Sequence, residues 1–507
     1  MPTTITPQEF VAKWRHITLK ERSASQSHFN DLCRLVGDTP PVEADPDGGW
    51  YAFEKGASKS SGGEGFADVW KRGHFAWEYK GLHADLNAAY QQLLQYREAL
   101  ENPPLLVVSD MHEIVVHTNF TNTVKRVIRF ELDDLLDAAR LTQLRQVFLD
   151  PQAFLVPRTA EDVTRDAAAK FARLAELLRA QGVEPERAAH FLIRLLFCLF
   201  SEDVGLLPDG LFGRLARQAR LRPDDFQAQL RQLFAAMNTG GWFGEHEIRH
   251  FDGGLFDSDL ALKLDAESME VLAAVADLDW GSIEPSILGT LFERGLDPNK
   301  RAQLGAHYTS RDDILLIVEP VLMAPLRRRW ADVQDQARAI AKKRDEAAPR
   351  ARAKPQEELR QLLAGFAAEI AAIQVLDPAC GSGNFLYVAL RQLLDLWKVV
   401  SALGSQLGLA LMTPLPGLAP HPAQLHGIEI NPYAHELAQA TIWIGYLQWL
   451  DENGFGFPAP PILQPLRNVL EMDAILAYDA QGKPVEPAWP AANVIIGNPP
   501  FLGGGRI

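Results

Sequence analysis

The segment Val375-Leu-Asp-Pro-Ala-Cys-Gly-Ser-Gly-Asn-Phe-Leu386 carries the strongest fold signal in the chain. An apolar strand runs into Asp377, a turn of small residues follows, and an apolar helix begins directly after the turn. Gly381 and Gly383 have no Cβ, so the backbone can turn tightly there and approach a ligand closely. The N-terminus of the helix offers free N–H groups to an anion such as a carboxylate or phosphate. The segment therefore predicts a ligand site at the carboxyl end of a parallel strand.

The sequence around this segment predicts an open parallel sheet. Strand-like runs at 373–376, 424–428 and 493–496 alternate with helices, which is typical of a doubly wound, Rossmann-like fold. The dinucleotide-binding spacing GxGxxG is not met, because Leu386 stands where the third glycine would be. The sequence also contains no GxxxxGK[ST], so a Walker-type ATPase or helicase has no support.

Two further elements follow strands of this sheet. Glu429, in Gly427-Ile-Glu-Ile-Asn431, ends the second strand, and an acid at this position of a doubly wound sheet binds a ribose diol. Asn498-Pro-Pro-Phe501 follows the third strand, where Pro499 and Pro500 fix an extended backbone without N–H donors. The bare Pro499 carbonyl and the Asn498 amide oxygen suit an amino group, and Phe501 offers a flat face to a base. Taken alone, each element also fits an ordinary strand end.

Together, Asp377-Pro-Ala-Cys-Gly-Ser-Gly383 and Asn498-Pro-Pro-Phe501 resemble the paired signature of the amino-directed DNA methyltransferases. The resemblance implies that the first segment binds S-adenosylmethionine and that the second is the catalytic loop. Gly305-Ala-His-Tyr-Thr-Ser310 resembles the segment that closes over the methionine end of the cofactor. The cofactor-binding residues implied by this resemblance are Tyr308, Thr309, Asp377, Ala379, Gly381, Gly383, Glu429 and Asp473.

The order of the three segments is similar to that of the gamma class, which mostly makes N6-methyladenine in double-stranded DNA. N4-methylcytosine enzymes share the four-residue motif, so both bases stay open. The implied reaction is a direct methyl transfer to a base extruded from the duplex, without a metal or a covalent intermediate. The implied catalytic residues are Asn498, Pro499, Pro500 and Phe501.

A second candidate site lies in residues 66–80, near the N-terminus. Asp68 lies in one strand, the chain reverses, and Glu78 and Lys80 then share one side of the return strand because strand side chains alternate. Asp68 and Glu78 together suit Mg²⁺, and a lysine beside them can position the attacking water. Read alone, an acid–x–Lys pattern in a polar hairpin more often has no catalytic role.

The pattern Asp-x9-Glu-x-Lys resembles the core of the PD-(D/E)xK nucleases, with Ala67 in place of the usual proline. Gln92-x-x-x-Tyr96 resembles an accessory motif of one nuclease branch, and residues 191–203 resemble a spacer. Nuclease, spacer and gamma-class methyltransferase in one chain are similar to the single-chain Type IIL/IIG restriction–modification enzymes. The domains expected from this resemblance are a nuclease-like α/β domain over 1–155, a helical spacer over 156–300 and an incomplete Rossmann-like methyltransferase over 301–507.

Composition fits several globular domains, since 47% of the 507 residues are hydrophobic and 23% are charged. The net charge of −15 argues only weakly against DNA, because phosphate contacts need a local basic stripe. The basic, alanine-rich stretch 327–363 predicts two exposed helices or a helical hairpin, for which a solvated face is the more frequent role. Three distant cysteines suit a reducing cytosol, so we expect a cytoplasmic protein, and the longest apolar run is too short to span a bilayer.

Relatives in this family continue past the catalytic loop into further strands and a target-recognition domain, whereas this sequence ends at Ile507. We therefore expect a truncated chain or a partner chain that supplies target recognition, and a last strand exposed at the sheet edge. A methyltransferase acting on a protein glutamine amide and a non-catalytic, DNA-binding phage-defence component are the alternatives. The Asn498–Phe501 loop disfavours a small-molecule methyltransferase.

Overall fold

The structure is a computed structural model. It describes residues 5–16, 21–58, 64–121, 123–208, 210–219, 223–251, 254–258, 260–285, 310–409, 417–460, 462–464 and 466–499. The chain divides into two compact units. The first contains Met1–Thr159, Ser401–Met412 and Glu452–Phe455, and the second contains Ala160–Val400, Thr413–Asp451 and Gly456–Ile507. The predicted domain boundaries near residues 155 and 300 stay predictions.

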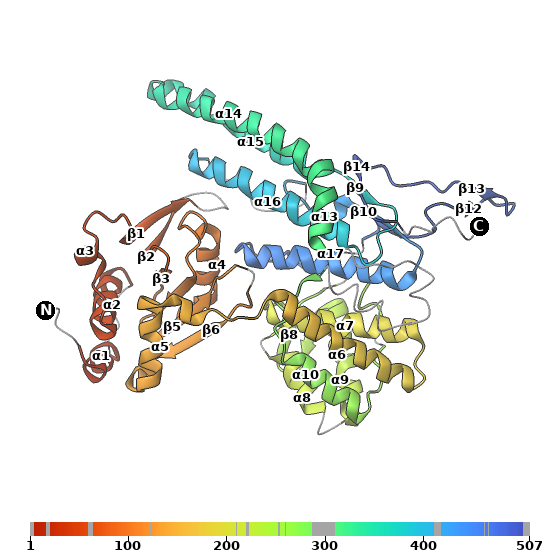
Figure 1. Cartoon of the computed structure of the whole chain (residues 1–507), viewed down its shortest axis with the longest axis horizontal. Coiled ribbons are helices and arrows are strands. Elements are labelled where there is room, and N and C mark those ends of the chain that lie inside the picture. Colours follow the sequence, from red (N-terminus) through yellow and green to blue (C-terminus); the bar gives the residue numbers. More distant parts are fainter. Residues whose placement is uncertain are drawn as a thin grey trace. The chain divides into compact units, whose positions relative to one another are not determined.

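The first unit is built on a six-stranded sheet in the order β1-β2-β3-β4-β5-β6 (Figure 1). The β3–β4 pair is parallel and the other four pairs are antiparallel. Helix α4 (Leu86–Tyr96) makes the crossover between the two parallel strands, as a parallel pair requires. The strands are β1 (Tyr51–Ser58), β2 (Glu64–Lys71), β3 (Phe75–Tyr79), β4 (Leu105–Ser109), β5 (Glu113–Thr118) and β6 (Val127–Glu131).

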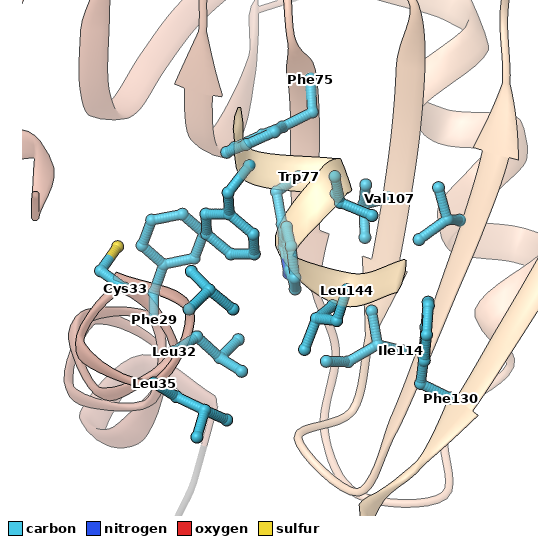
Figure 2. Packing of buried hydrophobic residues seen from close by; sticks show 14 of the residues in the cluster. Phe29, Leu32, Cys33, Leu35, Phe75, Trp77, Val107, Ile114, Phe130 and Leu144 are labelled. Carbon is cyan, nitrogen blue, oxygen red and sulfur yellow. The ribbon is translucent and has the colours of Figure 1, made fainter. Parts of the chain in front are cut away.

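The two faces of this sheet are covered by different elements. On one face, Phe29 of α2 and Leu144 of α5 pack with Phe75, Trp77 and other strand residues in a single apolar cluster (Figure 2). On the other face, α4 packs on a second cluster. The odd-numbered residues of β3 face the first cluster, so Glu78 lies on the α4 side of the sheet. The remaining elements are α1 (Pro7–Trp14), α2 (Glu21–Val36), α3 (Pro41–Ala44), a 3-10 turn (Leu132–Leu136), α5 (Ala138–Leu149) and a second 3-10 turn (Pro151–Phe154).

The second unit begins with the predicted helical region. Its first two helices are α6 (Ala160–Ala180) and α7 (Pro185–Asp203). Arg194 of α7 is fully buried and donates to the backbone carbonyls of Leu255, Ser258 and Leu260, which holds that loop against the helices. The other elements are α8 (Leu211–Ala219), α9 (Pro223–Thr239), α10 (Ala266–Ala276) and a small hairpin of β7 (Gly241–Phe243) and β8 (His246–Ile248).

The basic stretch forms a helical hairpin, which is one of the two arrangements that the sequence predicted. Helix α14 (Ala324–Glu346) and helix α15 (Ala353–Ala372) run side by side (Figure 1), and Trp330 stacks on Phe366 with ring centroids 5.5 Å apart. A 3-10 turn (Pro349–Ala351) joins them, and α13 (Arg311–Val318) with a π-helical turn (Glu319–Met323) precedes them.

The C-terminal sheet has the order β11-β10-β9-β14, and all three of its pairs are parallel. Its strands are β9 (Val375–Asp377), β10 (Leu425–Glu429), β11 (Val469–Glu471) and β14 (Val494–Ile495). Helix α16 (Asn384–Gln406) connects β9 to β10, a 3-10 turn (Pro422–Gln424) precedes β10, and α17 (Pro432–Glu452) connects β10 to β11. A short hairpin of β12 (Ala477–Tyr478) and β13 (Pro484–Val485) lies between β11 and β14. The predicted doubly wound α/β class is confirmed.

Strand order reverses between β9 and β14. The chain first adds β10 and β11 on one side of β9 and then places β14 on the other side. In open α/β sheets, ligands bind at the carboxyl ends of the strands where the order reverses. Among the described helices, none is both long and apolar enough to cross a membrane. The three cysteines are buried and free.

Candidate functional site

The two loops predicted to form one site leave neighbouring strands at the same edge of the sheet. In the parallel β9–β14 pair, Val375 lies opposite Val494 and Leu376 opposite Ile495. The N–H of Ile496 donates to the carbonyl of Leu376 over 2.9 Å, which continues the ladder to the strand ends. The chain therefore enters the Asp377 loop and the Asn498 loop side by side, at the point where strand order reverses.

Asp377 and Gly497 bring these loops into direct contact. The Asp377 side chain is buried, and its Oδ1 accepts from the N–H of Ala379 over 3.0 Å. A Cβ on Gly497 would lie only 2.4 Å from the same oxygen, so no side chain fits there. Asn498 and Pro499 follow directly, and both are exposed at the carboxyl end of β14.

The glycine loop has the backbone that its sequence predicts. Gly381 and Gly383 have φ values of 52° and 81°, in the left-handed region that glycine adopts at little cost. A Cβ on Gly383 would lie 3.1 Å from Ala438 of α17, so this glycine also permits close packing of the loop on the helix. The N–H of Cys380 donates to the carbonyl of Ile428, which ties the loop to the neighbouring strand β10.

Glu429, at the end of β10, is tied to the glycine loop. Its Oε2 accepts from the N–H of Gly381 and its Oε1 from the N–H of Asn431, each over 2.8 Å. A carboxylate oxygen has two lone pairs, so these bonds leave acceptor capacity for the hydroxyls of a ligand. Asp473, two residues beyond β11, accepts from the N–H groups of Ile475 and Leu476 through Oδ1. Both predicted acids therefore lie at the carboxyl edge of the sheet.

Two apolar side chains at this edge were missed in the sequence analysis. Ile430 directly follows Glu429 and is 59% exposed, and Ile475 lies two residues beyond Asp473 and is 83% exposed. Exposed isoleucines beside strand-end acids suit the flat face of a heterocyclic ring. The signal that could have identified them is an isoleucine one or two positions after each predicted acid. Four predicted residues lie outside the described residues: Tyr308, Thr309, Pro500 and Phe501.

The burial of Asp377 has a measurable consequence. Burial raises the pKa of Asp377 to about 7, and the nearby Glu429 carboxylate adds to the rise. In the unfolded chain an aspartate titrates near 3.9, so the folded state holds the proton more tightly. Stability from this group is therefore fully present below about pH 4 and is lost as the pH rises to about 7, by at most about 4 kcal/mol.

We expect the unfolding free energy of the second unit to fall between pH 5 and pH 8, and Asp377→Asn to reduce that fall, because asparagine does not titrate. Urea unfolding of both proteins at the two pH values measures the difference. Equal pH dependence in the wild type and Asp377→Asn would show that Asp377 is already ionised at pH 5.

Gly497→Ala is expected to lower any methyl transfer by this site about 10²-fold, because its Cβ must push the Asn498 loop away from Asp377 and a displacement near 1 Å has that cost. Gly482→Ala is the matched control, since Gly482 also has a positive φ, of 77°, but open space around its missing Cβ. The measurement is the single-turnover rate of both variants. Equal rates in Gly497→Ala and Gly482→Ala would show that the contact between the two loops does not position the reacting groups.

The second predicted site is brought together on the α4 face of the first unit. Lys80 Nζ donates to Glu78 Oε1 over 2.8 Å and to Gln92 Oε1 over 3.1 Å. The hydroxyl of Tyr96 donates to Glu78 Oε2 over 3.0 Å. Burial raises the pKa of Tyr96, and the Glu78 carboxylate adds to the rise, so the phenol stays a donor. Both residues of the Gln92-x-x-x-Tyr96 pattern therefore contact the predicted acid–x–Lys pair.

Asp68 lies on the neighbouring strand β2. It precedes Val69, which pairs with Trp77, so the antiparallel register brings Asp68 opposite Glu78. Asp68 Oδ2 accepts from the N–H of Tyr79 over 2.6 Å. Within the described part of the chain, no group of three or more His, Cys, Asp or Glu side chains forms a metal cage. Two carboxylates suffice for Mg²⁺ where substrate phosphate and water complete the shell.

Family comparison covers most of the chain in three consecutive matches. Residues 5–181 match the MmeI N-terminal domain, residues 186–256 the MmeI helicase spacer domain and residues 351–506 the MmeI DNA-methyltransferase domain. The sheet with its two contacting loops lies within the third match. The chain thus carries a DNA-methyltransferase domain of the MmeI type.

Individual relatives agree with these matches. DNA methyltransferase A of Bacillus subtilis (strain 168) is 29% identical over 354 residues, which are 66% of this chain and 37% of the relative. The solved structure of the Type IIL restriction-modification enzyme MmeI in complex with DNA is 26% identical, with a TM-score of 0.50, and the match covers 61% of this chain and 40% of that one. The chain therefore spans about two fifths or less of the length of these relatives. Its three domain matches and their order show that it belongs to the MmeI-like family of Type IIL/IIG restriction–modification proteins.

Proposed function

We propose that this chain transfers a methyl group from S-adenosylmethionine to the exocyclic N6 of adenine in double-stranded DNA, as part of a restriction–modification protein. The observation that carries the proposal is the contact between the two loops: Gly497 lies against the Asp377 carboxylate where strand order reverses. A donor held by the first loop and an amine held by the second would then meet at one edge of the sheet.

The residues at this edge fit S-adenosylmethionine. The left-handed glycines let the loop backbone approach the ligand, the Glu429 carboxylate can accept from ribose hydroxyls, and Asp473 can accept from an adenine amino group. Ile430 and Ile475 would flank the ring. When bound, the cofactor supplies a methyl group on a sulfonium centre. Tyr308 and Thr309 are proposed as contacts to its methionine end.

Asn498 and Pro499 are proposed to hold the target amine. The Asn498 amide oxygen and the Pro499 carbonyl are acceptors, and both residues are exposed at the strand end, where an extruded base can reach them. Accepting two N–H bonds draws the nitrogen lone pair toward the donor, so the rate would come from positioning and electrostatics. Pro500 would keep the loop extended, and Phe501 would stack on the base.

We also propose that the N-terminal unit is a Mg²⁺-dependent endonuclease. Asp68 and Glu78 would hold the metal ion, and Lys80 would position water beside the scissile phosphate. The support is the side-chain network on one face of the sheet, in which Lys80 contacts Glu78 while Gln92 and Tyr96 hold the pair from α4. Such a network keeps the lysine beside the carboxylate before substrate arrives.

The product base tests the methyltransferase proposal. The full chain is incubated with duplex DNA and S-adenosylmethionine, and the DNA is digested to nucleosides and separated by chromatography. N6-methyladenine is the expected product, and S-adenosylhomocysteine should suppress it. N4-methylcytosine would change the base assignment, methylated protein glutamine would change the substrate class, and no methylated product would contradict the proposal and favour a non-catalytic DNA-binding role.

A further inference from the structure

The end of the α14–α15 hairpin is strongly basic in an acidic chain. We call residues 338–354 the hairpin tip. It contains seven Lys or Arg residues against two acids, whereas the whole chain has a net charge of −15. The basic residues are Arg338, Lys342, Lys343, Arg344, Arg350, Arg352 and Lys354. Such a local excess marks a surface that attracts polyanions whatever the total charge.

Packing gives the hairpin tip a defined shape. Below the tip, buried apolar side chains of both helices meet, among them Val333 of α14 and Leu363 of α15. At the tip itself, Arg344 Nη1 donates to Gln356 Oε1 over 2.8 Å, and Arg352 Nε donates to the carbonyl of Ala347 over 3.0 Å. Two of the seven cations therefore fix the turn, and the turn presents the others outward.

The pairing of cations changes along the hairpin. Near its base, Arg327 pairs with Glu319 and Arg329 with Glu369. At the tip, five exposed cations form no salt bridge within the described part of the chain: Arg338, Lys343, Arg350, Arg352 and Lys354. Within the described residues, two of the three arginines at positions 327–329 therefore form a salt bridge, whereas at the tip only Lys342 and Arg344 of the seven cations do.

The cations at the start of α15 do not stabilise the helix. Helix α15 begins after Arg352, carries Lys354 in its first turn and has no acid in that turn. The helix dipole makes cations unfavourable at an N-terminus. Helices α6, α10 and α13 have acids in the first turn, whereas α4, α5 and α14 have none, like α15. The cations at the start of α15 therefore cost local stability, which is reasonable where they bind a partner.

We propose that the hairpin tip binds the phosphate backbone of double-stranded DNA beside the target site. The inference rests on the proposed function, in which this unit binds DNA. It adds a surface that contacts phosphates and no bases. The 23 residues of α14 extend about 35 Å at 1.5 Å per residue. That length corresponds to about ten base pairs at 3.4 Å each. The tip would thus hold flanking duplex rather than the extruded base.

The salt dependence of DNA binding tests this surface. The full chain, the triple variant Lys343→Gln/Arg350→Gln/Lys354→Gln and a control triple are titrated onto labelled duplex between about 0.05 M and 0.2 M salt. The control is Arg165→Gln/Lys170→Gln/Arg173→Gln on α6, which removes the same charge from cations that have acidic partners. Each lost phosphate contact should reduce the slope of log K against log salt by about 0.9.

The expected result is a slope smaller by about 2 to 3 and a Kd at least about tenfold weaker at the lowest salt for the tip variant. The control should follow the wild type, and melting temperatures should agree closely because five of the six residues are exposed and Lys170 is partly exposed. If the wild type binds DNA and both triple variants show the same slope of log K against log salt, the proposed DNA contact at the hairpin tip is wrong, while the proposed function stands. If the wild type binds no DNA at the lowest salt, the proposed function and this inference both fail.

Discussion

Asn498→Ala is expected to lower the rate of methyl transfer to DNA roughly 10³-fold, because removing one positioned acceptor from a transition state has that order of cost. The Asn498 side chain is exposed at the end of β14, beyond the contact between Gly497 and Asp377. Its loss leaves the glycine loop, Glu429 and Asp473 in place, so cofactor affinity should not change. Single-turnover transfer of a tritiated methyl group measures the rate, and calorimetry measures cofactor binding.

Asn493→Ala is the matched control for this prediction. Asn493 lies at the opposite end of the same strand, where its Oδ1 accepts from the N–H of Gln374 over 2.8 Å. This substitution removes the same kind of side chain from the residue just before β14 and should leave the methyl-transfer rate nearly unchanged. A loss of rate in both variants would point to a general weakening of β14. Full activity in Asn498→Ala would remove this residue from the proposed catalytic role.

Lys80→Ala is expected to lower Mg²⁺-dependent DNA cleavage roughly 10³-fold and to leave methyl transfer unchanged. Lys80 is the only charged group of the proposed nuclease site that can offset phosphate charge, and its Nζ lies 2.8 Å from Glu78 Oε1. Without it, the buried Glu78 carboxylate would keep the Tyr96 hydroxyl as a partner. Conversion of supercoiled plasmid to nicked or linear DNA measures cleavage, and the methyl-transfer assay on the same preparation shows that the chain is folded.

Lys55→Ala serves as the control for Lys80. Lys55 lies on strand β1 of the same sheet, and its ammonium group lies over the Trp70 ring, 4.5 Å from the centroid. A cleavage rate that falls equally in both variants would indicate a loss of fold in the first unit. Cleavage that persists in Lys80→Ala would contradict the nuclease assignment, and so would a wild-type chain that cannot cleave with Mg²⁺.

The elements that the sequence predicted well are those fixed by local chemistry. Glycines at 381 and 383 specify a left-handed turn, and the apolar run before Asp377 specifies a strand wherever it pairs. The alternation in β3 likewise placed Glu78 and Lys80 on one side without knowledge of the neighbouring strands. Pro349 begins the turn that separates the basic stretch into two helices, and Pro355 lies in the first turn of the second helix, where proline is tolerated.

Contacts between distant segments could not be predicted in this way. Nothing in the pattern around Gly497 shows that its missing Cβ makes room for the Asp377 carboxylate, because that contact depends on which strand pairs with β9. The bond from Tyr96 to Glu78 depends on how α4 crosses the sheet, and the exposure of Ile475 depends on the path taken beyond β11. Each follows from strand order and crossover geometry, which a single sequence does not specify.

The pairing of β14 with β9 also bears on how the pocket assembles. Gln374 and Asn493, which join these two strands at their start, are 119 positions apart in the chain. Strand β9, helix α16 and strand β10 are neighbours in sequence and close much shorter loops, so the half of the pocket meant for the methyl donor can form early. The half proposed to hold the acceptor arises only when β14 docks on β9. During synthesis on the ribosome, the nascent chain would thus form the proposed donor half of the pocket before the proposed acceptor half.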